Sequence, residues 1–190
     1  MKKPLQSLIL ASQSPRRKHL LAAMGFSFTT AVRPVNEKFP SEMQIDQVAN
    51  HIALQKAAAF KTDINPNTII ITGDTIVCVD DLVLGKPKDE QEAKAMLQSF
   101  SGRSHRVISS VCLLSSEKEV VMSDSTTVHF RQLSEEEIEH YISQYKPFDK
   151  AGAYGIQEWI GHVAISKIEG SYNTVMGLPT HLLYEMLRDF

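Results

Sequence analysis

The feature that most constrains the fold is a pair of apolar, β-branched runs separated by Gly73-Asp74-Thr75. The first run covers 68–72 (Thr-Ile-Ile-Ile-Thr) and the second covers 76–79 (Ile-Val-Cys-Val). Continuous runs of this kind are typical of strands that are buried on both faces, so each needs a layer of structure above and below it. The sequence therefore predicts two strands inside a sheet, with Asp74 at a strand end.

Strand and helix patterns alternate along the rest of the chain. We expect further strands over 6–11, 26–32, 82–84, 105–115, 119–130 and 163–168, and helices over 15–24, 41–60, 89–100, 134–145 and 180–188. Several strands are joined by short turns, as at Asp80-Asp81, which favours a mixed sheet over a purely parallel one. The expected fold class is α/β, a mixed β-sheet flanked by helices. Residues 1–190 show no internal repeat or linker and are expected to form a single domain.

Charge and cysteine content exclude some classes of function. The chain has 20 Lys and Arg against 22 Asp and Glu, a formal net charge of −2, which argues against broad electrostatic binding to nucleic acid or membrane. Cys78 and Cys112 lie in apolar runs and are expected to be buried thiols. The apolar stretch after Met1-Lys2-Lys3-Pro4 is too short for a signal peptide, and no run reaches transmembrane length. A cytoplasmic location is expected.

Residues 10–17 (Leu-Ala-Ser-Gln-Ser-Pro-Arg-Arg) predict the end of a strand, a tight turn and the start of a helix. Ser14 fits the N-cap and Pro15 the first helical position. A helix N-terminus suits an anion, and the guanidinium groups of Arg16 and Arg17 match phosphate oxygens in pairs. By itself the turn fits a phosphate site and an ordinary helix start with solvated arginines equally well.

Two acids supply candidate chemistry. Asp74 lies between apolar strands, where a carboxylate is costly unless it is paired, bound to a ligand or protonated. It is predicted to be a metal ligand or general base, with a turn residue that caps a backbone N–H as the alternative. Glu37, in a loop bounded by Pro34 and Pro40, could reach the same cleft, although alone it is expected to be solvent-exposed.

Several cations and one amide extend this set. Lys56, on a predicted helix among alanines, would by itself be expected to be solvated. Lys86 lies on a short stiff loop before a proline and is a better candidate for a phosphate contact. Lys150 and Gln157 flank a loop of small residues, and the Gln157 amide could bind the edge of a base.

Taken together, these residues would supply cations that bind phosphates, one or two carboxylates that bind a divalent cation, and a small polar loop that binds a nucleotide base. Metal-assisted hydrolysis of a nucleotide phosphoanhydride uses this set. The sequence contains no H-x-x-x-H, H-E-x-x-H, G-x-S-x-G, Walker A or G-x-G-x-x-G pattern. Histidine metal sites, serine hydrolases, P-loop proteins and Rossmann dinucleotide binding therefore lack support.

Five motifs occur in order along almost the whole chain. They are Leu-Ala-Ser-x-Ser-Pro-Arg-Arg at 10–17, Gly-Asp-Thr at 73–75, Gly-Lys-Pro at 85–87, Asp-Lys-Ala-Gly-Ala-Tyr-Gly-Ile-Gln at 149–157 and Gly-Ser-Tyr-x-x-Val-x-Gly-Leu-Pro at 170–179. Together they strongly resemble the Maf family of nucleoside triphosphate pyrophosphatases, also called septum formation inhibitor proteins. The resemblance implies an elongated mixed α/β fold (Maf / ITPase-like) with two lobes around a deep cleft, and a homodimer.

The resemblance also implies hydrolysis of a nucleoside triphosphate to the monophosphate and pyrophosphate with a divalent cation, Mg²⁺ or alternatively Mn²⁺ or Co²⁺. The matching positions are Asp74 as the proton acceptor, Glu37 as a further acid, and Ser12, Arg16, Arg17, Lys56 and Lys86 as substrate-binding residues. From the residues themselves, Glu37 and Asp74 are the predicted metal ligands, and Lys150, beside Gln157, is a further predicted substrate-binding residue. Which acid holds the metal and which takes the proton stays open.

Substrate class in the family follows three positions, here Arg16, Thr75 and Gln157. This trio is similar to the branch that acts on dTTP and UTP, a house-cleaning activity, and differs from the branch that prefers 7-methyl-GTP. Gly73 and Gln13 depart from the usual family residues and are expected to affect rate rather than reaction. Two alternatives are a nucleotide-binding regulator of septum formation with little catalysis, and a hydrolase of inosine, xanthosine or modified pyrimidine triphosphates.

Overall fold

The computed structural model describes residues 7–62 and 64–190, and its sheet confirms the expected α/β class. The described strands form one seven-stranded sheet in the order β2-β1-β3-β5-β6-β7, with β4 paired to β3. Their bounds are β1 (Ser7–Leu10), β2 (Phe28–Thr30), β3 (Thr68–Val79), β4 (Leu82–Leu84), β5 (Ser104–Leu114), β6 (Glu119–Phe130) and β7 (Ile165–Glu169). The sheet is mixed, because β1 is parallel to β2 and β3, whereas β4 and β7 are antiparallel to β3 and β6.

Helices flank this sheet. They are α1 (Pro15–Ala23), α2 (Ile45–Ala58), α3 (Glu90–Phe100), α4 (Glu135–Tyr145), α5 (Trp159–Ala164), α6 (Tyr172–Met176) and α7 (Thr180–Asp189), with a 3₁₀ turn, η1 (Ala151–Ala153). Within the described part of the chain, no helix has the length and apolarity that crossing a membrane requires. Met1-Lys2-Lys3-Pro4 and Gln6, where the first strand was predicted to begin, lie outside the described residues.

The chain divides into two compact units, each assembled from segments that are distant in sequence. The first unit takes in the chain up to Asp74, Ser109–Asp124 and Gly177–Phe190. The second unit consists of Thr75–Ile108 and Ser125–Met176. Strands β3, β5 and β6 each contribute one part to each unit.

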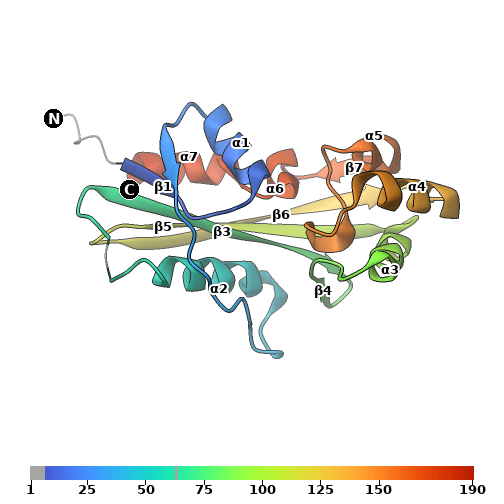
Figure 1. The fold of residues 1–190 in the computed structure, drawn as a ribbon, viewed down its shortest axis with the longest axis horizontal. Coiled ribbons are helices and arrows are strands. Elements are labelled where there is room, and N and C mark those ends of the chain that lie inside the picture. The colour runs from blue at the N-terminus through green and yellow to red at the C-terminus, as the bar shows by residue number, and fades with distance from the viewer. Residues whose placement is uncertain (1–6, 63) are drawn as a thin grey trace. The chain divides into compact units, whose positions relative to one another are not determined.

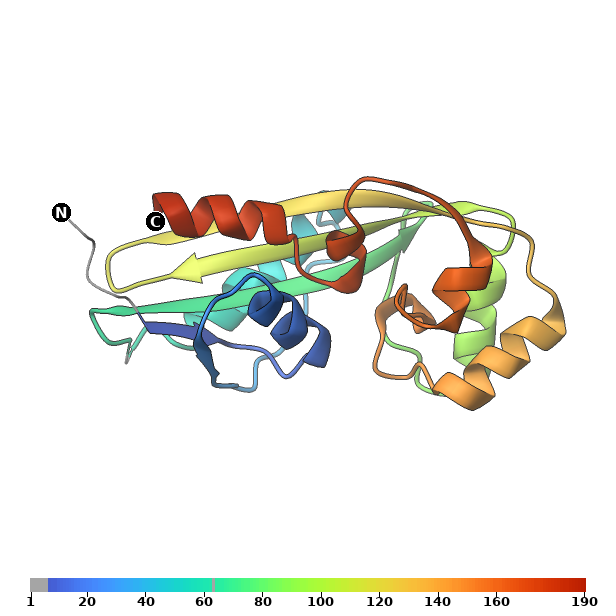
Figure 2. The same cartoon turned by 90° about the horizontal axis from the view of Figure 1, so that it is seen from above.

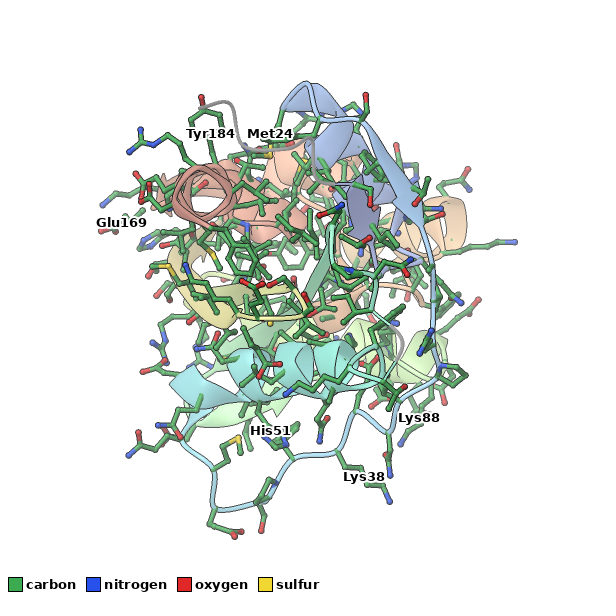
Figure 3. All side chains as sticks on the ribbon, turned by 90° about the vertical axis from the view of Figure 1, so that its left-hand side faces the viewer. Met24, Lys38, His51, Lys88, Glu169 and Tyr184 are labelled. Atoms are coloured by element: carbon green, nitrogen blue, oxygen red, sulfur yellow. The ribbon has the colours of Figure 1, made fainter. Side chains whose placement is uncertain are left out.

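In the first unit, helices cover both faces of the sheet. Helix α2 lies along one face, and α1 and α7 lie along the other (Figure 1). The view from above agrees, since α1 and α7 lie in front of the strands and α2 lies behind them (Figure 2). Figure 3 labels His51 on α2 at one side of the sheet and Tyr184 on α7 with Met24 at the other.

Small residues bring α2 close to the sheet. Ala49, Ala53 and Ala57 recur on one face of the helix and are fully buried. Ile70 of β3 and Cys112 of β5 pack in the same cluster as Ala53 and Ala57. The backbone of α2 therefore comes within hydrogen-bonding reach of side chains on the sheet.

In the second unit, an apolar cluster lies under α3 and α4. Leu97 and Phe100 of α3 and Ile138 of α4 are buried in it. Helix α4 begins with the capping-box pattern of its sequence: the Ser134 hydroxyl accepts the Glu137 N–H, and the Glu137 carboxylate accepts the Ser134 N–H. Local sequence therefore explains where α4 begins.

One predicted boundary was wrong in a way that matters for the site. Residues 68–79 form one continuous strand, so Asp74 lies within β3 and not at a strand end. At Asp74 the buried backbone N–H donates to the Ser110 hydroxyl at 3.1 Å, so this group is paired inside the strand.

Other predicted boundaries were also wrong. Val163 and Ala164 end α5, and the strand starts only at Ile165, the first residue with a partner on β6. Residues 172–176 form α6 where a loop was expected. Helix α2 starts at Ile45, because residues 41–43 form a turn. The expected buried thiols, Cys78 and Cys112, are confirmed.

Candidate functional site

The turn before α1 folds as its sequence predicts. The Ser14 side chain accepts the backbone N–H of Arg17 at 3.3 Å, and Pro15 is the first residue of the helix. The hydroxyl of Ser12, which is buried, accepts the Ser14 N–H at 3.1 Å. Two hydroxyls therefore shape a helix N-terminus whose first turn carries Arg16 and Arg17.

Arg17 is held in place by a segment far away in the sequence. Its Nε donates to the carbonyl oxygen of Gly177 at 2.8 Å. Burial lowers the pKa of the Arg17 guanidinium, while the nearby carboxylates of Asp74 and Glu37 counter that decrease. Arg17 is therefore a positioned cation in the field of the two predicted acids.

Lys56 joins those two acids. Its Nζ lies 2.7 Å from Asp74 Oδ1 and 3.1 Å from Glu37 Oε1. The Lys56 side chain is 16% exposed, so the expectation that it would be solvated is wrong. The reason is that its face of α2 turns toward β3, where the buried Asp74 side chain meets it. Glu37 is exposed, as expected, with 53% of its side chain accessible.

The two carboxylates have the chemistry of a magnesium site that the substrate completes. Among residues 7–62 and 64–190, no group of three or more His, Cys, Asp and Glu side chains is placed to hold a metal ion. Asp74 and Glu37 nevertheless converge on one positive charge, the Lys56 ammonium. Mg²⁺ commonly binds one or two carboxylates and fills its other positions with water and substrate phosphates. The pair therefore fits a cation that arrives with a polyphosphate.

The second unit holds another group of predicted residues, around the loop at 149–157. Lys150 is buried, with its Nζ 2.6 Å from Asp149 Oδ1 and 3.1 Å from Glu158 Oε1. Lys86 is exposed on a neighbouring loop. The Gly152 N–H donates to the carbonyl oxygen of Gly85 at 3.0 Å, which joins the two loops. Thr75, the first residue of this unit, is half-buried.

Gln157 carries an acceptor without a protein donor. Its Oε1 is buried and has no hydrogen-bond partner among the described residues. Its Nε2 lies close to Gly155: a Cβ added to that glycine would be only 2.9 Å from the Gln157 Nε2. A buried amide oxygen is costly to leave unpaired, so a donor from a ligand would stabilise it.

Two residues that support this loop were missed from the sequence. The Tyr141 hydroxyl donates to Glu158 Oε2 and accepts the Gly155 N–H at 3.0 Å. Burial raises the pKa of Tyr141, and the bond to Glu158 adds to that increase. No motif marks either residue; the apolar spacing of α4 could have indicated only that Tyr141 faces the core.

Two hydroxyls beside Asp74 were missed as well. Ser110 on β5 and Thr72 on β3 are buried, and both bind backbone groups of α2. In the sequence they are small polar residues within largely apolar strands, and Ser110 is one of two adjacent serines, so only their unexpected polarity could have drawn attention to them.

Comparison with known proteins identifies a family to which the chain is similar and three similar proteins. The model of the family of Maf-like proteins matches residues 7–190. A dTTP/UTP pyrophosphatase of Porphyromonas gingivalis is 45% identical over 96% of this chain and 94% of its own length. The dTTP/UTP pyrophosphatases of Christiangramia forsetii and Phocaeicola vulgatus are both 46% identical, over 96% and 95% of this chain and 93% and 94% of their own lengths.

The fold also has a match among solved structures. The Ham1 protein of Staphylococcus aureus aligns with a TM-score of 0.54 over 97% of this chain and 99% of that one. At 13% identity this likeness concerns the fold alone. The family model, by contrast, spans nearly the whole chain and covers every candidate residue described above. This chain therefore belongs to the family of Maf-like proteins.

Proposed function

We propose that this chain hydrolyses dTTP and UTP to the nucleoside monophosphate and pyrophosphate, and that it also acts on modified pyrimidine triphosphates. Relatives named dTTP/UTP pyrophosphatase support this substrate class, since they share about 45% identity over nearly the full length. The observation that carries the proposal is the Asp74–Lys56–Glu37 cluster in the field of Arg17. It combines an acid for water activation with cations for phosphate.

In the proposed reaction, a water molecule attacks the α-phosphorus and the bond to the bridging oxygen of pyrophosphate breaks. Asp74 accepts the proton from that water, and Lys56 orients the carboxylate by binding its Oδ1. Arg17, with Arg16, Ser12 and the N-terminus of α1, would bind the triphosphate and stabilise the charge that develops on the leaving pyrophosphate.

A divalent cation would supply charge neutralisation on the phosphates when it is bound. Asp74 and Glu37 are the residues that would hold it, because both carboxylates already face one cationic group. Lys86 and Lys150 would add positive charge for the substrate.

Gln157, Thr75 and Arg16 would determine which base is accepted. The buried Oε1 of Gln157 needs a donor, and the N3–H of thymine or uracil is one. Neutral cytosine has no hydrogen at N3, so this contact favours dTTP and UTP over CTP.

A nucleotide panel tests the proposal. With Mg²⁺, we expect phosphate from dTTP and UTP well above that from ATP, and only when inorganic pyrophosphatase is added. Asp74→Asn should lower kcat by roughly 10²–10⁴-fold, the range for loss of a general base. Asp81→Asn, at an exposed turn, is the matched control. Near-normal turnover of Asp74→Asn would contradict the role of Asp74. Thermal stabilisation by dTTP without turnover would instead support a nucleotide-binding regulator.

From the family resemblance alone, we also propose that the chain forms a homodimer. Sedimentation velocity measures this directly. A single species at the mass of one chain, 21.3 kDa, at micromolar concentration would contradict it.

A further inference from the structure

We infer that Thr72 and Ser110 are positioning residues whose hydroxyls hold α2 against β3 and so set the contact between Lys56 and Asp74. The inference rests on the proposed function, because it concerns how two groups of the proposed reaction are placed. Neither hydroxyl belongs to a motif of the sequence, and neither has a part in the chemistry described above.

Ser110 connects three elements through one oxygen atom. Its side chain is fully buried on β5. The hydroxyl donates to the carbonyl oxygen of Ala49 on α2 at 2.7 Å and accepts the backbone N–H of Asp74 on β3 at 3.1 Å. A shift of α2 relative to β3 would therefore break or stretch one of these two bonds.

Thr72 makes a second bond of the same kind. Its hydroxyl donates to the carbonyl oxygen of Ala53 at 2.7 Å, and the Cys112 thiol also contacts it. A carbonyl oxygen has two lone pairs, so Ala53 can accept this bond and keep its bond within the helix. Thr72 therefore binds the middle of α2 to the sheet without removing a hydrogen bond within the helix.

The helix residues that make the two hydroxyl bonds and the ion pair lie in one row along α2. Residues 49, 53 and 56 are spaced by four and three positions, so they lie on the same face of α2. The Lys56 Nζ reaches Asp74 Oδ1 at 2.7 Å from the end of this row. The position of α2 sets how far and from which direction the Lys56 stem must reach, so a shift of the helix changes the geometry of this contact.

Gly73 makes the row possible. A Cβ at this position would lie 2.4 Å from the carbonyl oxygen of Ser110, closer than two such atoms can approach. The absence of a side chain therefore lets β5 come close enough for the Ser110 hydroxyl to reach the Asp74 N–H. This is a structural reason for glycine immediately before Asp74.

Thr72→Val is the main test, since it deletes the hydroxyl and keeps the branched shape. We expect kcat for dTTP to fall about tenfold, because sub-ångström misplacement of a reacting group is costly, and KM to change less than about twofold. Thr72→Ser retains the hydroxyl and should keep kcat near the wild-type value. Thr68→Val, on the same strand but with its hydroxyl bonded to Ser7, is the control and should leave kcat unchanged.

A double-mutant cycle separates positioning from a general loss of stability. Thr72→Val acts on α2, and hence on Lys56, so in a Lys56→Met background it should lower the remaining kcat by less than about twofold. An equal fall in both backgrounds, or an equal fall for Thr68→Val, would overturn the inference. If Thr72→Val does not fold, Ser110→Ala against the equally buried Ser109→Ala makes the same comparison.

Failure of the proposed function is distinguishable from failure of this inference. If the wild-type chain does not hydrolyse dTTP, the proposed function fails before any variant is compared. The same cycle is then measured in the free energy of unfolding. Coupling between Thr72→Val and Lys56→Met supports the inference, and additivity overturns it.

Discussion

Asp74 is a buried carboxylate in the middle of a strand, and its neighbours explain how the fold tolerates it. Lys56 binds its side chain, Ser110 binds its backbone N–H, and Gly73 leaves room for that second bond. The importance of Asp74 could be predicted, because an acid inside an apolar run is costly. The family resemblance also named Lys56 as a site residue, but not as the partner of Asp74, and it did not name Ser110. The two lie 18 and 36 positions from Asp74, so local sequence does not bring them together.

The two arginines of α1 should respond differently to substitution. Arg17→Ala should lower kcat/KM for every nucleoside triphosphate by a similar factor, about tenfold or more, because all of them share the phosphates that Arg17 is proposed to bind. Arg16→Trp should instead change the ratio of dTTP to ATP turnover more than it lowers the best rate. Steady-state kinetics on dTTP, UTP, CTP and ATP measure both effects.

Lys18→Ala, at an exposed position of the same helix, is the control for these two variants. A change of substrate preference in Arg17→Ala, with a uniform loss in Arg16→Trp, would reverse the proposed roles.

Among the secondary-structure elements, helix α4 shows how much of a helix start its local sequence explains. Its first turn holds a capping box of Ser134 and Glu137, two residues whose spacing in the sequence is typical of that motif. The structure adds Arg131, whose guanidinium binds the Glu137 carboxylate at 2.7 Å. This bond lowers the pKa of Glu137 from its usual value of 4.5 to about 2, and the bond from the Ser134 N–H makes the second-largest contribution to that decrease.

The depressed pKa of Glu137 predicts an acid-sensitive contribution to stability. The folded pKa is the lower one, so the contribution is complete above pH 4.5 and is lost as pH falls toward 2. Glu137→Gln should therefore lower the melting temperature at pH 7 and flatten its decline between pH 4.5 and 2. Thermal unfolding followed by circular dichroism across that range tests this. Glu136→Gln, in the same first turn, is the control. If the melting temperatures of the two variants depend on pH in the same way, the predicted contribution of Glu137 is refuted.

At the scale of the whole molecule, the chain returns to its first unit at the end. Gly177–Phe190 belongs to that unit, although Ser125–Met176 of the second unit separates it from the preceding segment of the first unit, which ends at Asp124. Leu178 and Leu183 of this segment are fully buried, and the Gly177 carbonyl binds Arg17. Neither unit is a continuous stretch of chain, so neither can be predicted by cutting the sequence at a linker.

Removal of the segment after Met176 should therefore prevent the first unit from folding. Each buried leucine contributes about 1.5–3 kcal/mol, against a total stability of roughly 5–15 kcal/mol for a typical protein. We expect the truncated chain to lose cooperative thermal unfolding and most of its strand signal in circular dichroism. Arg188→Ala, at an exposed position of α7, should melt like the wild type. A truncated chain that melts at the wild-type temperature would contradict this.

Features that depend on neighbouring residues or on apolar pattern could be predicted before the fold was known. These are the caps of α1 and α4, the turn at Asp80 between β3 and β4, the apolar strands and the family motifs. Each follows from residues a few positions apart, because a cap or turn is formed by local hydrogen bonds and dihedral preferences.

The packing of distant segments determines which polar side chains contact one another. It joined Lys56 to Asp74 and Glu37, Lys150 to Glu158, and the hydroxyls of Thr72 and Ser110 to α2. In the sequence, a lysine on a helix or a serine in a strand is indistinguishable from an ordinary surface or core residue. Its role depends on a partner that burial and backbone packing bring within 3 Å or so, and those act between segments far apart in the chain.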